Sequence, residues 1–539
     1  MYRRRVRILP AVLLAALAAG PAVALPLPPS AEEVVVRKLI AAPVGFDKYV
    51  FTGEAFPTPT FAPSPDLVKL AGPFAVSATY YDRDGAKVGT AAAPGPYFAV
   101  VTVTPKHRPP LTRHVTLYRL ARPLDENMPA ALGLDSERID RQAALIADPV
   151  NGRSRALSGD DPQRHARRYA GIALTPPAKV ALTAQDDADA YERQAWVTLR
   201  RKLTGLDKAF PNPVEAPTPV RGKPAPVVRE GTEAEAGMKP GTAAKIDAAL
   251  STWAADDDHA FAVCVVRRGV IVLHKAYGTR DGKPMTVDTP SWMASVTKPM
   301  SASLLLMLAD RGLITLDDPV EKFVPALRGL KANQPLLIRH LATHTNGLGK
   351  WPSGDDTLDD GEYRVADYYH LLKVGKAWEY NGGGYMLGGK VIENVSGEAV
   401  PLFYKRHLLD PLGCTHTQVI GTHADAYSTP LDMAKFGQML LNRGAYGPHL
   451  FFSPATFEAM LPRRLTAELG PDTQKTFGFG LDGRAEKFGH GAASAATFSV
   501  DVENELVVIM TRNKFGKNQG KYNGPFWDAI TAGIEPKKP

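Results

Sequence analysis

Ser291-Trp-Met-Ala-Ser-Val-Thr-Lys-Pro-Met300 is the stretch that decides the fold. It places Lys298 three positions after Ser295, and no other serine in the sequence has a lysine at that spacing. Residues three apart on a helix lie on one face, so the amine of Lys298 would reach the Ser295 hydroxyl. Pro299 is tolerated only in a first helical turn, which places Ser295 at the start of a helix.

A serine in that position could act as a nucleophile, because free N–H groups and the helix dipole favour anionic charge at a helix start. Lys298 could take the serine proton only when neutral. Lowering its pKa from ~10.4 to ~7 requires about 4 to 5 kcal/mol of destabilisation of the charged form, which burial can supply. The spacing of Met300, Leu304, Met307 and Leu308 is that of a buried helix. On spacing alone, an N-cap serine with a surface lysine fits the same pattern.

Strands are predicted at both ends of the second half of the chain. Four apolar runs form two hairpin candidates, 261–267 with 270–276 and 497–502 with 506–510. We expect them to share one antiparallel sheet, with a final helix near 525–534 and a helix-rich lobe over 299–470. The predicted fold class is α+β (an α/β sandwich), an antiparallel sheet flanked by helices plus a helical lobe.

The chain before this region is predicted to be a separate accessory part. A proline-rich linker over 211–230 is the clearest boundary. Alternating residues near 74–80, 97–104 and 114–120 predict a small β-rich domain, and a helical segment follows it. The predicted division is a signal peptide at 1–24, a β-rich accessory domain at 25–125, a helical segment at 126–210, the linker, and a catalytic domain at 231–539.

The first residues predict export. Four arginines precede an apolar run of roughly 12 residues, short of the ~20 that a membrane-spanning helix needs, and Ala22-Val23-Ala24 follows. A cleavable signal predicts a periplasmic or secreted protein with no transmembrane anchor. Removing the four arginines lowers the formal charge from +8 to +4, which is ordinary, so nucleic acid is not an expected partner.

No metal or other cofactor is expected. His and Cys residues show no ligand spacing with a suitable third ligand, and the His-Glu-x-x-His motif is absent. Cys264 and Cys414 are the only cysteines. An oxidising compartment permits a bridge between them, but their apolar surroundings favour buried free thiols.

Several further motifs follow Ser295 in a fixed order, and together they resemble the serine β-lactamase, penicillin-binding protein and esterase superfamily. The resemblance covers about residues 231–535 and is strongest to the class C β-lactamase and family VIII esterase branch. The segments that carry it are Ala294-Ser-Val-Thr-Lys-Pro299, Gly312-Leu-Ile-Thr-Leu-Asp-Asp-Pro-Val320, Ile338-Arg-His-Leu-Ala-Thr-His-Thr-Asn-Gly-Leu348, Tyr380-Asn-Gly-Gly-Gly-Tyr-Met-Leu-Gly388, Asp410-Pro-Leu-Gly413, Asp432-Met-Ala-Lys-Phe-Gly437 and Phe488-Gly-His-Gly-Ala492.

The resemblance implies a role for each matching residue. Ser295 would be the acylated nucleophile and Lys298 its base. Tyr380 would relay a proton to the leaving group, a role that requires a neighbouring positive charge to lower the phenol pKa. His490 would line the site from a strand, and the backbone N–H groups of Ser295 and Ala493 would form the oxyanion hole.

Two departures from the family pattern bear on the substrate. The expected Tyr-x-Asn motif has Gly382 in its third position and Asn381 one place early, and Gly491, next to Ala492, replaces a hydroxyl residue that would hold a substrate carboxylate. These four positions are the expected substrate-binding residues. The changes favour a small-molecule ester or amide as substrate over β-lactams or peptidoglycan-derived D-amino-acid peptides.

Three functions therefore remain open from the sequence. An esterase or small acyl hydrolase is expected first. A β-lactamase or D-amino-acid peptidase is the nearer alternative, and a weakly active module that binds the cell wall is the more distant one.

Overall fold

The computed structural model describes most of the chain from residue 184 onward and part of the region before it. The described residues are 44–46, 50–61, 73–119 without 83, 94 and 107–110, and 184–536 without 216, 281, 350–361, 363–364, 367–368 and 420. The predicted signal peptide and the helical segment before residue 184 lie outside them. Within the described residues, no helix is both long and apolar enough to cross a bilayer.

A six-stranded antiparallel sheet forms the centre of the second half of the chain. Its order is β10-β9-β23-β22-β21-β20, so strands from both ends of this half share one antiparallel sheet, as predicted, and β9 pairs directly with β23. The strands are β10 (Val270–Tyr277), β9 (Phe261–Arg267), β23 (Leu506–Thr511), β22 (Thr497–Asp501), β21 (Lys487–Gly491) and β20 (Asp482–Arg484). Arg268 and Gly269, with φ of 54° and 76°, form the tight turn between β9 and β10.

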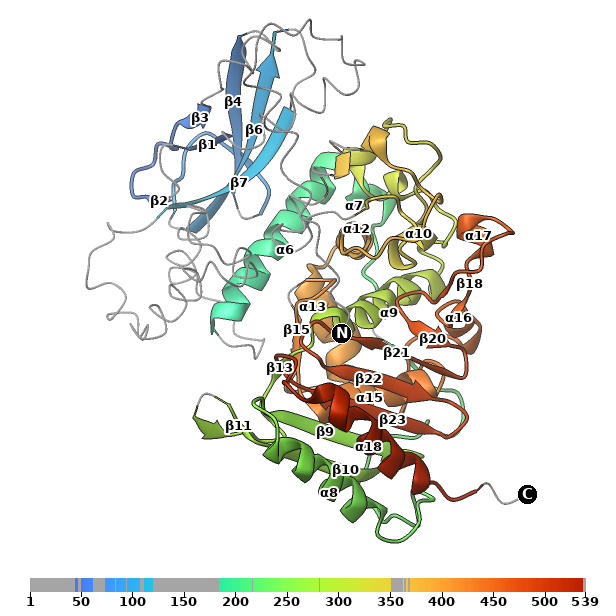
Figure 1. Cartoon of the computed structure of the whole chain (residues 1–539). Coiled ribbons are helices and arrows are strands. Elements are labelled where there is room, and N and C mark those ends of the chain that lie inside the picture. Colours follow the sequence, from blue (N-terminus) through green and yellow to red (C-terminus); the bar gives the residue numbers. More distant parts are fainter. Residues whose placement is uncertain are drawn as a thin grey trace, which may run out of the picture.

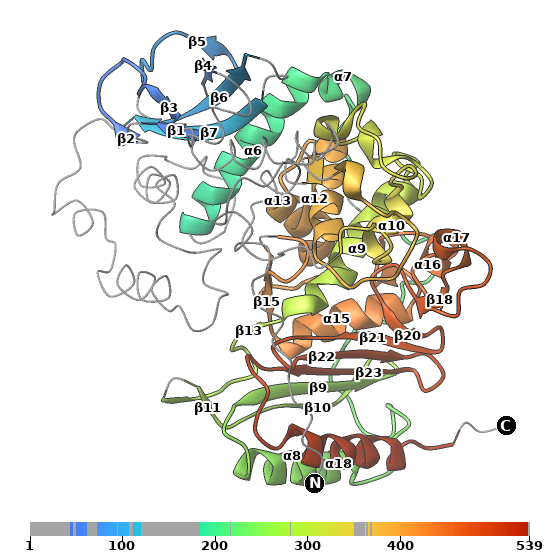
Figure 2. The same ribbon diagram turned by 45° about the horizontal axis from the view of Figure 1, so that its top comes forward.

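Helices cover both faces of this sheet (Figures 1 and 2). On one face, α8 (Thr242–Ala255) and α18 (Gln519–Ala532) bury Ile246, Leu250, Trp253 and Phe526 against β9 and β23. On the other face, α15 (Pro430–Leu441) contacts β9, β22 and β23. The predicted α/β sandwich is confirmed.

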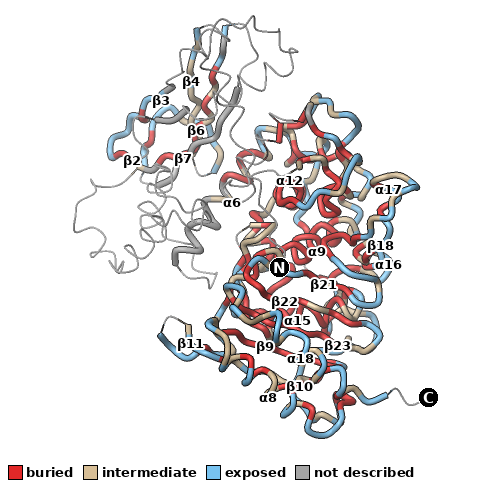
Figure 3. The backbone as a smooth tube through the Cα atoms, viewed as in Figure 1, coloured by how far each residue is buried: buried red, intermediate tan, exposed pale blue. Residues whose placement is uncertain are grey.

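A helical lobe lies beyond α15, as expected for the segment between the two groups of strands. It contains α9 (Thr297–Asp310), α10 (Ile338–Ala342), α12 (Gly383–Ser396) and α13 (Val400–Tyr404). Every residue of α9 from 297 to 308 is buried, so the helix is enclosed on all sides and not only on the predicted face (Figure 3). This enclosure gives the residues at its start a rigid, dry support.

The region before residue 120 contains a five-stranded sheet in the order β2-β7-β6-β4-β5. Its strands are β2 (Val50–Phe51), β7 (Leu111–Arg119), β6 (Gly95–Pro105), β4 (Phe74–Tyr81) and β5 (Lys87–Val88). One face has a small core of Phe51, Tyr97, Ala99, Val101 and Leu117. The sheet is where the alternating sequence predicted strands, and β2 joins β7 in parallel.

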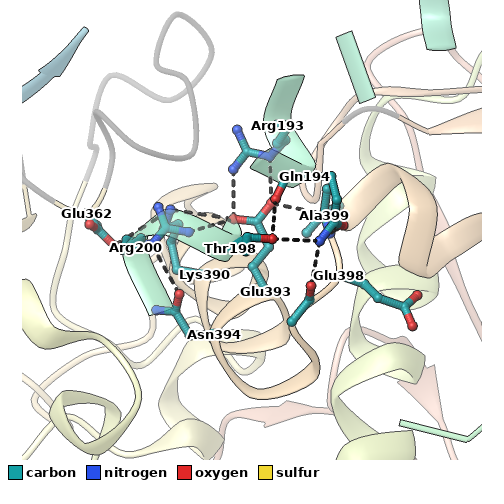
Figure 4. Close-up of polar contacts among 12 residues, drawn as sticks. Arg193, Gln194, Thr198, Arg200, Glu362, Lys390, Glu393, Asn394, Glu398 and Ala399 are labelled. Carbon is teal, nitrogen blue, oxygen red and sulfur yellow. Dashed lines mark hydrogen bonds and ion pairs between the residues drawn. The ribbon is translucent and has the colours of Figure 1, made fainter. Parts of the chain in front are cut away.

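The helix α6 (Ala184–Thr204) contacts both parts of the chain. Trp196 packs its ring 4.4 Å from that of Phe98 in β6. From the same helix, Arg193 and Arg200 reach Glu393 in α12, with N–O distances of 2.5 and 3.2 Å (Figure 4). The Glu393 side chain is 0% exposed. Although α6 precedes the proline-rich linker, it packs against the catalytic half, which the predicted division did not anticipate.

Breaking this buried ion network is expected to destabilise the fold. The change Arg200→Leu would leave the buried Glu393 carboxylate with one cation fewer, at a cost of about 3 kcal/mol. The exposed Lys202 on the same helix gives a control, because Lys202→Ala should change stability by less than about 0.5 kcal/mol. Urea unfolding followed by tryptophan fluorescence measures both. Equal stability of the two variants would show that the network contributes nothing.

Candidate active site

Ser295 lies in a single 3-10 turn, Ala294–Val296, that leads directly into α9. Ala294 has φ of 44°, a left-handed conformation that costs a residue other than glycine roughly 1 kcal/mol or more. Thr297 stabilises the turn, because its hydroxyl donates to the Ala294 carbonyl at 2.7 Å. Pro299 falls in the first turn of α9, where it removes no helical hydrogen bond. The turn therefore holds Ser295 at the helix start, as the sequence predicted.

Lys298 points back toward this serine. Its Nζ lies 3.2 Å from Ser295 Oγ and donates to the His423 carbonyl at 2.8 Å. The residue is only 2% exposed. Burial lowers the pKa of the amine to about 7, although the negative charge of Asp425 acts in the opposite direction. A large fraction of the amine is thus neutral near pH 7, the state in which it can accept a proton.

Tyr380 covers the same pair of groups from the loop before α12. Lys298 Nζ lies 4.8 Å from the centre of its ring. Partial burial raises the pKa of this phenol, and the nearby Ser295 hydroxyl opposes the rise. The expectation of a lowered pKa is therefore wrong, because the effect of burial outweighs that of Ser295. Tyr380 is a neutral phenol that can donate a hydrogen bond.

His490 lies on β21, on the far side of the site from α12. Its ring centre is 6.0 Å from that of Tyr380, and its Nδ1 is 2.6 Å from the Gly491 carbonyl. Because Nδ1 must donate to that carbonyl, the proton sits on Nδ1 and Nε2 is an acceptor. Burial lowers the pKa of His490 to about 4. The imidazole is neutral, and its buried Nε2 has no partner among the described residues.

The residues after His490 form an open rim. Gly491 and Ala493 are exposed, Ala492 is partly buried, and β21 contacts the turn that carries Ser295. A Cβ added to Gly491 would meet no heavy atom within 4 Å. The site thus has free space where the family pattern has a hydroxyl side chain. The oxyanion-hole role of the Ser295 and Ala493 N–H groups stays a prediction.

Asn381 and Gly382 are part of the support for α12. The Asn381 amide bonds to Asn346, the Glu379 carbonyl and the Gly384 N–H, at distances between 2.7 and 3.2 Å. These bonds use both amide hydrogens and both lone pairs of the oxygen. The side chain is buried, so it has no free group for a substrate, and Gly382 serves as the N-cap residue of α12.

His344 is a member of the site that was not predicted from the sequence. Its ring centre lies 4.4 Å from that of Tyr380, and its Nδ1 accepts the N–H of Asn381 at 3.2 Å. Burial holds the pKa of His344 well below its ordinary value, so the imidazole is neutral. The residue belongs to the quoted segment 338–348, and that segment was the available signal. His423 and Asp425 were also missed, because they lie in no recognisable motif.

This arrangement can support acyl transfer. A half-buried hydroxyl, a buried amine with a pKa near neutrality and a phenol lie within contact distance at the start of an enclosed helix. These parts are those of a serine hydrolase in which lysine takes the place of the usual histidine base.

Comparison with known proteins agrees with this class. Residues 252–532, more than half of the chain, match the Beta-lactamase family. The chain therefore belongs to the Beta-lactamase family, and it is an enzyme of the serine hydrolase class.

The names of individual relatives refer to different activities. Esterase EstB of Burkholderia gladioli is 30% identical over 213 residues, which cover 35% of this chain and 54% of the esterase. Teichoic acid D-alanine hydrolase of Staphylococcus aureus (strain MRSA252) is 25% identical, over 48% of this chain and 71% of that protein. A solved penicillin-binding protein homologue from Caulobacter crescentus has a TM-score of 0.47 and 17% identity, over 55% of this chain and 99% of that chain. The match to the esterase spans only about half of its length.

Proposed function

We propose that the protein hydrolyses small esters through an acyl-enzyme on Ser295. The observation that carries the proposal is the 3.2 Å contact between Ser295 Oγ and a buried lysine amine whose pKa is about 7. Lys298 accepts the serine proton as Oγ bonds to the substrate carbonyl carbon. The backbone N–H groups of Ser295 and Ala493 stabilise the resulting oxyanion.

Tyr380 completes the proton transfers in this proposal. As the C–O bond of the ester breaks, the neutral phenol donates its proton to the departing alcohol and recovers one from the Lys298 ammonium. Water then attacks the acyl group, gives up a proton along the same route in reverse and releases the acid. The neutral His490 offers a hydrogen-bond acceptor beside the phenol.

An ester is favoured as substrate because the groups expected for other substrates are missing. The Asn381 amide is bonded internally, Gly382 has no side chain, and Gly491 has no hydroxyl to hold a carboxylate. The name of the Burkholderia relative, an esterase, agrees with this choice. The intact contact between Ser295 and Lys298 disfavours an inert binding module.

A substrate panel tests the proposal. Initial rates on short-chain p-nitrophenyl esters, nitrocefin and D-alanyl amides are measured with one preparation. We expect measurable ester turnover and weak or no β-lactam hydrolysis. Faster hydrolysis of nitrocefin or of the amides than of every ester would assign the chain to the β-lactamase or D-amino-acid peptidase alternative.

Restoring a hydroxyl at position 491 is expected to change substrate preference. The change Gly491→Thr places a hydroxyl in open space on the rim, where a hydrogen bond to a substrate carboxylate would raise kcat/KM about tenfold. The measurement compares acyl donors with and without a carboxylate. Gly491→Ala adds a Cβ without the hydroxyl and should leave the ratio unchanged. A ratio equal in both variants would remove the carboxylate argument.

We also propose that the protein is exported to the periplasm or secreted. The support is the succession of four arginines, an apolar run and Ala22-Val23-Ala24 at the start of the sequence. N-terminal sequencing of the protein recovered from the producing cells would test it, since cleavage is expected after Ala24.

A further inference from the structure

A short loop holds the lysine through a backbone carbonyl. Residues 422–426 enter β15 (Ala426–Ser428), which pairs with β13 (Ser291–Trp292) beside the nucleophile turn (Figure 1). We call residues 422–426 the clamp loop. Its bonds to the segment around the serine are Ser301 Oγ to Thr422 O (2.6 Å), Lys298 Nζ to His423 O (2.8 Å), Trp292 Nε1 to Ala424 O (2.6 Å), Ala426 N to Thr297 Oγ1 (3.0 Å) and Met293 N to Ala426 O (2.8 Å).

These bonds also fix Asp425 near the lysine. The Asp425 carboxylate lies 3.6 Å from Nδ1 of His423. The backbone carbonyl of His423 accepts the hydrogen bond from the Lys298 amine. Gly421 leaves room for this position, because a Cβ there would overlap the carboxylate. With its neighbours on both sides bonded to the nucleophile segment, the carboxylate has little freedom to move away.

Asp425 is the one acidic group of the described residues whose charge raises the pKa of Lys298. The other titratable groups that face the amine come from several elements, and all of them are neutral near pH 7: Tyr380 and Tyr385 around the start of α12, His344 after α10, His490 on β21 and His423 in the clamp loop. Asp482 on β20 affects Tyr380 and His490 instead. The charge on Asp425 is therefore not duplicated by a second carboxylate.

We propose that Asp425 is a positioning residue that sets the pH range in which Lys298 acts as the base, with His423 as its counter-ion when protonated. The inference rests on the proposed function of Ser295 and Lys298. An anion near the amine favours its protonated form, which cannot accept the serine proton. Asp425 thus raises the pH at which the lysine loses its proton. Protonation of His423 would cancel part of this effect.

The change Asp425→Asn tests the inference, because it removes the charge and keeps the size of the side chain. The rate of Ser295 labelling by a fluorophosphonate probe is measured from pH 5 to 9 for the natural protein and the variant. The midpoint of the acidic limb should move to lower pH by at least about half a unit, which raises the rate on that limb about threefold. Asp425→Glu retains the charge and should leave the midpoint near that of the natural protein.

Asp482→Asn is the matched control, since it neutralises the other nearby carboxylate and should not move the acidic limb. An unchanged midpoint in Asp425→Asn, or an equal shift in Asp482→Asn, would overturn the inference. Circular dichroism confirms that each variant is folded before its profile is compared. Absence of any labelling of the natural protein would instead reject the proposed function itself, so the two failures are distinguishable.

Discussion

Replacing Ser295 by alanine is expected to lower kcat/KM for the best ester by about 10⁴-fold or more. The Oγ atom forms the bond to the substrate carbonyl, and no nearby group of the site can replace it. Ser295 lies at the mouth of the site and is only half-buried, so the fold should be unaffected. Steady-state kinetics with an enzyme concentration high enough to detect residual activity measures the loss.

Ser303→Ala provides the control for this change. Ser303 is a buried serine on the same helix, and its hydroxyl bonds only to the Pro299 carbonyl and the Met460 sulfur among the described residues. Its removal should change kcat/KM by less than a few fold. A Ser295→Ala protein that keeps a tenth or more of the natural activity would show that the nucleophile lies elsewhere.

Replacing Lys298 by methionine is expected to remove activity and stabilise the fold at the same time. Without the amine, the serine proton has no acceptor, and kcat/KM should fall by about 10³-fold or more. The stability effect follows from burial. The pKa of Lys298 is about 7 in the folded protein and ordinary in the unfolded chain, so the unfolded state binds the extra proton over the range between the two values.

Lys298 destabilises the natural protein increasingly as pH falls from about 10.5 to 7, by on the order of 4 kcal/mol at pH 7 if nothing else changes. Lys298→Met should therefore raise the melting temperature near pH 7 and have little effect near pH 10. Lys298→Arg keeps a buried positive charge. This variant should be inactive, and its melting temperature near pH 7 should not rise. A methionine variant less stable than the natural protein at pH 7 would contradict the buried neutral amine.

The same pKa predicts the pH dependence of the natural enzyme. Because the neutral amine is the base, kcat/KM should rise with pH through a midpoint near 7.

The parts of the structure that could be predicted from the sequence depend on local or strongly apolar patterns. Ser295 and Lys298 are one helical turn apart, so their contact follows from helix geometry once Pro299 fixes where the helix begins. The runs that became β9 and β23 are wholly buried, and their apolar composition predicted strands of one shared antiparallel sheet. The direct pairing of β9 with β23 was not predicted, because no local pattern specifies which strands of a sheet are neighbours.

The parts that could not be predicted depend on contacts between distant polar groups. Arg193 and Arg200 approach Glu393 from about 200 positions away, and no local pattern marks such a partner. The lysine bonds to a backbone carbonyl at His423, which any residue could supply. The pKa direction of Tyr380 was mistaken because it depends on how far the phenol is buried, which only the folded chain determines.

The most direct test of the account is the site of covalent modification. The protein is incubated with a fluorophosphonate, digested with trypsin and analysed by tandem mass spectrometry. Lys298 precedes proline and resists cleavage, so Ser295 is expected in peptide 281–311, which also contains Ser291, Ser301 and Ser303. We expect one adduct, located on Ser295 and absent from the Ser295→Ala protein. An adduct on another residue, or ester turnover that survives while Ser295 is fully modified, would contradict it.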